Sequence, residues 1–79
     1  MEHDHITMPA DVRQEIEHQL GIIRRSTTRE DAEKAGFRAQ GFVLGIERLR
    51  ALRPIDIETL YLLFEHTVEQ RLKQFAAND

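Results

Sequence analysis

The sequence predicts an all-α protein: a small three-helix chain in which the second and third helices form a long antiparallel hairpin. Three observations predict this class. Apolar residues recur at helical spacing along most of the 79 residues. Helix-capping residues and Pro54 divide the chain into three segments. No segment shows the apolar–polar alternation or the Asn-Gly turn that is typical of a β-hairpin.

The first helix is expected at about 9–24, after a flexible polar N-terminus at 1–8. Thr7 and Pro9 are typical of a helix start, because a hydroxyl group can cap the first turn and proline loses no hydrogen bond there. The chain would then be one helical domain over residues 9–77. The apolar residues of the first helix follow at helical spacing: Val12, Ile16, Leu20 and Ile23.

The second helix is expected at about 28–52. It is predicted to end before Pro54, because the residue that precedes a proline avoids the α conformation. A capping box marks its N-terminus, and two registers of this motif are open. The two capping pairs are Thr27 with Glu30 and Thr28 with Asp31.

The third helix is expected at about 56–76, with Asp56 as its cap. Ile55 and Leu60 are spaced for a hydrophobic staple, in which an apolar residue before the cap packs on the first turn. Only a short connection around Pro54 separates this helix from the second one, which favours an antiparallel hairpin. Its apolar stripe contains Ile57, Leu60, Tyr61, Phe64, Val68, Leu72 and Phe75.

The second helix is apolar on two sides, and this is the most informative feature of the chain. One stripe repeats every three or four residues and consists of Ala32, Ala35, Ala39, Phe42, Ile46 and Leu49. A second stripe, roughly opposite, consists of Phe37, Gly41, Leu44, Gly45 and Leu52. The third helix adds two apolar residues away from its main stripe, Leu62 and Leu63.

Three short helices are therefore expected to carry more apolar surface than they can cover among themselves. A chain of this size without disulfides usually needs a metal or a partner subunit for stability. We therefore expect a homodimer with the second helix near the two-fold axis. The expected interface contains Phe37, Gly41, Leu44, Gly45, Leu52, Leu62 and Leu63.

Three glycines inside the second helix support this expectation. Gly36, Gly41 and Gly45 each cost about 1 kcal/mol relative to alanine in a helix. The Gly41-x-x-x-Gly45 spacing would allow another helix to approach closely, a device best known from membrane helices. The alternative is that the second helix kinks or breaks at Gly41, which would give four short helices.

The composition excludes several classes of protein. The chain has 11 basic and 14 acidic residues, a formal net charge of −3 and no cysteine. Disulfide scaffolds, thiol catalysis and thiolate metal sites are therefore excluded. No apolar run approaches the ~20 residues of a membrane span. The N-terminus lacks the basic and apolar regions of a secretion signal, so a cytoplasmic location is expected.

Basic residues gather in two clusters, which suggests an alternative function. The clusters are Arg24, Arg25 and Arg29, and Arg48, Arg50 and Arg53. Arginine forms bidentate contacts with phosphate, so a dimeric DNA- or RNA-binding regulator is the alternative to a protein-binding module. The simpler explanation is that helix C-termini favour cations. The negative net charge also weighs against nucleic acid.

Candidate metal and catalytic residues are few. Glu15-x-x-His18 has the spacing of di-iron helix bundles, but His18 falls on the opposite side of the helix from its apolar stripe. The N-terminal Met1-Glu2-His3, with His5 nearby, could chelate Cu²⁺, although such binding is commonly incidental. His66 is expected on the surface. With no catalytic motif in the chain, we expect no enzyme, no cofactor and no metal.

The stretch from Ala35 to Leu72, with its internal glycines, resembles in general texture the small helical accessory proteins of bacteria and their phages. No functional residue follows from this resemblance. Together, these observations predict a small non-enzymatic module that binds another protein as an adaptor, modulator or inhibitor. The homodimer would use its remaining apolar residues or its arginines for these contacts.

Overall fold

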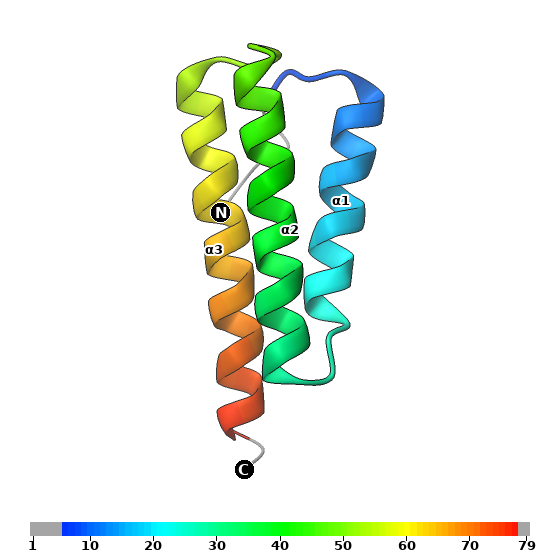
Figure 1. The fold of residues 1–79 in the computed structure, drawn as a ribbon, viewed down its shortest axis with the longest axis vertical. Coiled ribbons are helices and arrows are strands. Elements are labelled where there is room, and N and C mark those ends of the chain that lie inside the picture. The colour runs from blue at the N-terminus through cyan, green and yellow to red at the C-terminus, as the bar shows by residue number, and fades with distance from the viewer. Residues whose placement is uncertain (1–5, 78–79) are drawn as a thin grey trace.

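The chain folds into three helices that pack on one another (Figure 1). The computed structural model describes residues 6–77. Within this range, α1 spans Ala10–Arg24, α2 spans Arg29–Arg48 and α3 spans Pro54–Ala77, and there is no strand. The most extensive packing joins α2 to α3, which run antiparallel. The predicted all-α class and the α2–α3 hairpin are confirmed.

The start of α1 differs from the prediction. The residue that precedes the helix is Pro9, and no side chain caps the helix there, so the predicted hydroxyl cap from Thr7 is wrong. The Pro9 carbonyl accepts a hydrogen bond from the backbone N–H of Arg13 at 3.1 Å. At the other end, the N–H of Arg25 bonds the Gly21 carbonyl at 3.0 Å. The predicted C-terminus at residue 24 is correct.

The start of α2 follows one of the two predicted capping registers. Thr28 has an extended backbone, and its hydroxyl oxygen accepts a hydrogen bond from the N–H of Asp31 at 3.1 Å. The pair Thr28 and Asp31 therefore caps the helix, and the pair Thr27 and Glu30 does not. The helix runs unbroken through Gly41, so the four-helix alternative is wrong.

The end of α2 comes four residues earlier than predicted. Arg50 has a φ of 55°, in the left-handed region. Its N–H bonds the Glu47 carbonyl at 3.0 Å, and the N–H of Ala51 bonds the Ile46 carbonyl at 3.2 Å. These two bonds form a Schellman motif, which closes the helix after Arg48. Leu52 consequently lies in the connection rather than in the helix.

Pro54 opens α3 instead of preceding it, as suits a residue whose missing N–H costs nothing in a first turn. Asp56, predicted as the cap, lies inside the first turn and is buried. Its carboxylate accepts hydrogen bonds from Nε and Nη2 of Arg53, at 2.9 and 3.3 Å. The predicted start at residue 56 is thus two residues late.

A single apolar core fills the space between the helices. On α2 the buried side is wider than the predicted stripe, because this helix contacts both α1 and α3. Val43 and Gly36 are buried, whereas Phe42 is half-buried and Leu49 is 81% exposed. The buried apolar residues of the core are Ile6, Ile16, Leu20, Ile23, Ala35, Ala39, Val43, Ile46, Ile57, Leu60, Leu63 and Phe64.

The segment before α1 takes part in this core, contrary to the prediction of a flexible tail at 1–8. Ile6 is 1% exposed, and its carbonyl accepts a hydrogen bond from Nη2 of Arg13. Met8 packs against the same core. A single isoleucine between polar residues has no periodicity, so the sequence pattern could not reveal its burial. Met1, His3 and His5 lie outside the described residues.

Candidate interaction surface on the outer face of α2

The side of α2 that points away from the core forms a continuous surface, which we call the outer face. Counted from Glu30 to Arg48, the six positions of this face are separated by four, three, four, three and four residues. Residues with this spacing share one side of a helix. Phe37 is 70% exposed and Leu44 is 45% exposed. The outer face consists of Glu30, Lys34, Phe37, Gly41, Leu44 and Arg48, with Gly45 at its edge.

The glycines of the outer face are not required by packing within the chain. A Cβ atom built on Gly41 or on Gly45 would have no atom within 4 Å, apart from the helix's own nearby backbone. Gly36, on the inner side, differs sharply, because a Cβ there would lie 2.7 Å from Cγ2 of Val68. Close approach of α3 accounts for Gly36, whereas no packing contact among residues 6–77 accounts for Gly41 and Gly45.

The structure brings only part of the predicted dimer interface together. Phe37, Gly41, Leu44 and Gly45 lie on the outer face, as the helical periodicity predicts. Leu62 is 47% exposed, but it lies on the side of α3 away from the core. The remaining two residues, Leu52 and Leu63, contribute to the packing of the three helices, because Leu52 packs against the core and Leu63 is 4% exposed within it. Leu63 is therefore not available as an interface residue.

Two of the most exposed apolar side chains, Leu49 and Ile55, flank the α2–α3 connection. The sequence pattern predicts Leu49 in the inner stripe of α2 and Ile55 in a hydrophobic staple, but Leu49 is 81% exposed and Ile55 is 63% exposed. The position of Leu49 differs because α2 ends early, at Arg48. Ile55 differs because α3 begins at Pro54, so that Ile55 lies inside the first turn rather than before a cap. The signal for the end of a helix is usually a glycine, and at the end of α2 the left-handed position carries Arg50 instead.

The two predicted arginine clusters are exposed, and they occupy opposite ends of the bundle (Figure 1). The first lies around the α1–α2 loop and the second around the α2–α3 connection. A helix of 20 residues, the length of α2, spans about 30 Å, so the two clusters do not merge into one surface on this chain. Their members are Arg24, Arg25 and Arg29, and Arg48, Arg50 and Arg53.

Within the second cluster, Arg53 is engaged by Asp56. The hydrogen bond from Arg53 to the Asp56 carboxylate, and then the charge of that carboxylate, raise the pKa of the Arg53 guanidinium. Arg53 therefore stabilises the first turn of α3 through its contact with Asp56. It also contributes positive charge to this end of the molecule.

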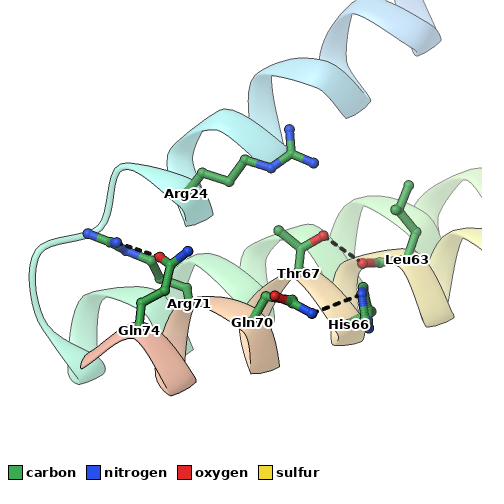
Figure 2. Close-up of a pocket in the computed structure, with 7 residues that line it drawn as sticks. All are labelled: Arg24, Leu63, His66, Thr67, Gln70, Arg71 and Gln74. Carbon is green, nitrogen blue, oxygen red and sulfur yellow. Dashed lines mark hydrogen bonds between the residues drawn. The ribbon is translucent and has the colours of Figure 1, made fainter. Parts of the chain in front are cut away.

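A polar groove lies between the end of α1 and the C-terminal half of α3 (Figure 2). Its lining residues are Arg24, Leu63, His66, Thr67, Gln70, Arg71 and Gln74. Arg71 donates from Nε and Nη2 to the Ser26 carbonyl, at 2.9 and 2.6 Å, and from Nη1 to Oε1 of Gln74 at 2.7 Å. Its guanidinium group also stacks on the Phe75 ring at 4.6 Å. These contacts tie the α1–α2 loop to α3.

Other polar groups of this groove are also bonded within α3. The Thr67 hydroxyl donates to the Leu63 carbonyl at 2.8 Å. His66 is exposed, as predicted, and its Nε2 lies 3.4 Å from Nε2 of Gln70. The groove is therefore built mainly of groups that hold the fold together.

The candidate metal ligands on α1 do not converge. His18 is exposed, while Glu15 is half-buried and accepts a hydrogen bond from Nε2 of Gln19 at 2.9 Å. Among residues 6–77, no group of three or more histidine or acidic side chains could hold a metal ion.

Tyr61 is the other titratable group with a perturbed pKa in the described range. Its hydroxyl donates to Oε1 of Glu47 at 3.4 Å and thereby links α3 to α2. Partial burial, and then the charge and the hydrogen bond of Glu47, raise the pKa of the Tyr61 phenol above its ordinary value. This contact is a structural link between the two helices.

No protein family matches this chain, and neither the curated proteins nor the solved structures include one that is significantly similar to it. A membrane-crossing helix, which would need greater length and apolar character, is not found in the part of the chain that the structure describes.

Proposed function

We propose that the protein is a small, non-enzymatic module of the cytoplasm that binds another protein and acts as a helical homodimer. The observation that carries this proposal is the outer face of α2, where Phe37 and Leu44 stay exposed beside two glycines. Burial of one such side chain contributes about 1.5–3 kcal/mol. Gly41 and Gly45 together cost about 2 kcal/mol of helix stability, which a close contact with another helix would offset.

A second copy of the chain would cover this face and leave a second surface free for the partner protein. That surface lies at the α2–α3 connection, where Leu49 and Ile55 are exposed next to the second arginine cluster. Apolar side chains surrounded by arginines are common in protein–protein interfaces, because arginine is enriched there and lysine is depleted. An adaptor or inhibitor would present this end of each subunit to its target.

The test is the mass of the particle in solution, measured by light scattering at tens of micromolar. The wild-type chain is expected to be a dimer. Replacement of both glycines by leucine (Gly41→Leu, Gly45→Leu) or the change Phe37→Asp is expected to give monomers that remain helical by circular dichroism. Ile55→Asp is the matched control, since Ile55 is nearly as exposed as Phe37 but lies off the outer face. A monomeric wild-type chain at that concentration refutes the homodimer.

The exposure of all six clustered arginines favours a second candidate, a dimeric DNA- or RNA-binding regulator. A dimer would place four basic clusters on one particle and could contact phosphates at several points. The observable is a gel shift with mixed DNA and RNA that weakens steeply as salt is added. No shift at low salt eliminates this candidate.

A further inference from the structure

The spacing of the outer-face positions is symmetrical about one point on α2. The six positions, from Glu30 to Arg48, have the same spacing when they are counted from either end. The midpoint falls at the level of Ala39, between Phe37 and Gly41. A helix with this property can meet a reversed copy of itself with every outer-face residue opposite another one.

We propose that two copies of the chain pack antiparallel through α2. The two-fold axis passes between the two helices, at the level of Ala39. This inference rests on the homodimer proposed above and adds its orientation and its contacts. In this arrangement Phe37 lies against the partner subunit's Gly41, Lys34 against its Leu44, and Glu30 against its Arg48.

Side-chain size fits this register. The Phe37 ring is 70% exposed, and Gly41 is open, with no atom within 4 Å of the position of a Cβ. A ring from one subunit would fill the place of the missing side chain on the other, twice per dimer. Facing helices commonly lie 8–10 Å apart, and the absence of a side chain at the contact allows the shorter distances of that range.

Charge decides between the two orientations. In the antiparallel register Glu30 meets an arginine at both ends of the interface. Parallel packing would place Glu30, Lys34 and Arg48 each against its own copy, so that like charges repel at three levels. Exposed ion pairs contribute little affinity, but repulsion between like charges is effective in rejecting a wrong arrangement. The apolar centre therefore supplies the affinity, and the charged ends select the direction.

Single cysteines test the direction, because the chain has none of its own. In the proposed register, Lys34→Cys in one subunit faces Leu44→Cys in the other, within the Cα separation that a disulfide needs. In a dimer of one variant, by contrast, the two identical cysteines lie about ten residues apart along the helix axis. At a rise of about 1.5 Å per residue this separation is about 15 Å, too far for a disulfide. We expect a mixture of the two variants to form disulfide-linked dimers, and each variant alone to form few.

Charge reversal tests the contacts. Glu30→Arg and Arg48→Glu are each expected to raise the dimer dissociation constant about tenfold, and the double variant is expected to restore it, as an interacting pair requires. Arg24→Glu is the matched control, because it makes the same charge change on α1, outside the interface. Circular dichroism checks that every variant is folded.

The outcomes separate the two proposals. A wild-type monomer refutes the homodimer and this register with it. A wild-type dimer whose single-cysteine variants link to themselves, or whose double charge reversal fails to restore affinity, leaves the homodimer in place and refutes the antiparallel register.

Discussion

Arg50 occupies a backbone conformation that usually belongs to glycine. At a φ of 55° its Cβ crowds the following carbonyl, which costs about 1–2 kcal/mol for a residue with a side chain. The Schellman motif holds it there, since the hydrogen bonds of Arg50 and Ala51 satisfy two carbonyls at the end of α2. The strain is therefore offset by helix termination, and it can be relieved by changing this one residue.

Arg50→Gly is expected to raise the free energy of unfolding by about 0.5–1 kcal/mol, because relief of strain exceeds the added freedom of glycine in the unfolded chain. For a domain of this size the melting temperature should rise by about 4 °C. Urea and thermal unfolding measure both quantities. Arg48→Gly, two residues earlier and inside the helix, should instead destabilise. A loss of stability in Arg50→Gly would show that the left-handed turn is not retained in solution.

Tyr61 reports on the contact between α2 and α3 without any label, because the chain has one tyrosine and no tryptophan. We expect its tyrosinate absorbance to titrate with a midpoint above 10 in the folded protein, since burial and Glu47 both disfavour the charged phenolate. Glu47→Gln should lower the midpoint only in part, because the burial of the phenol, the largest single cause, remains. A midpoint at the ordinary value of about 10 in the folded chain would mean that this contact is absent.

The raised pKa of Tyr61 also makes the stability of the fold depend on pH. A pKa that is higher in the folded state than in the unfolded state means that the neutral phenol of Tyr61 supports folding below about pH 10. That contribution is lost as the pH rises through the folded-state pKa. Tyr61→Phe, which cannot ionise, should therefore lose less stability than the wild type over the same alkaline range.

At the scale of the element, α2 contains a matched pair of glycines with opposite surroundings. Gly36→Ala is expected to destabilise by about 1 kcal/mol or more, because the new methyl group meets Val68 at 2.7 Å. Gly41→Ala is expected to stabilise the chain by up to about 1 kcal/mol, because the site is open and alanine is the better helix former. Urea unfolding at dilute protein concentration measures both.

The same experiment contains its own control, since both changes add one methyl group to the same helix. If the two variants changed stability in the same direction, the assignment of Gly36 to the α2–α3 contact and of Gly41 to the surface would be wrong. Gly45→Ala should behave like Gly41→Ala.

Helix boundaries were predictable where the terminating residue has a distinctive chemistry, and not elsewhere. Thr28 caps α2 through its hydroxyl, and the sequence offered this register as one of two. The end of α2 was not predictable, because an arginine holds the left-handed position and nothing in the sequence distinguishes it from a helical arginine. Pro54 was correctly recognised as a boundary, but it opens a helix here rather than closing one.

The buried side of α2 is wider than the single stripe that the spacing of apolar residues predicts. Spacings of three and four residues identify Ala35, Ala39 and Ile46 correctly. A helix that packs against two neighbours needs a wider buried face, and Val43 and Gly36 supply the extra width. Which of the flanking residues is buried depends on where α1 and α3 lie, and this is tertiary information.

At the scale of the whole molecule, the outer face was predictable because it depends only on the period of one helix. Phe37, Gly41 and Leu44 share a side of α2 wherever the other helices lie. The placement of Leu62 and Leu63 was not predictable in the same way, since one residue around α3 separates a surface position from the core. The Arg71 contact with Ser26, 45 residues away in the sequence, had no signal at all.

The residues before α1 complete the core of the molecule. Ile6 joins the apolar cluster, and Arg13 holds its carbonyl from the second turn of α1. Thr7 lies beside the α2–α3 connection, where it lines a shallow groove with Leu52 and Arg53. The N-terminal segment therefore crosses one end of the bundle and covers apolar side chains that three helices alone would leave open to water.

A core of this size supplies only about 3–5 kcal/mol of net stability, so one buried isoleucine is a large share of it. Ile6→Ala is expected to lower the free energy of unfolding by about 2 kcal/mol or more and the melting temperature by about 10 °C, because it removes a side chain that is 1% exposed. Thr7→Ala, at an exposed neighbouring position, should change stability little. Thermal unfolding followed by circular dichroism distinguishes them, and equal, small effects would show that the segment does not pack on the bundle in solution.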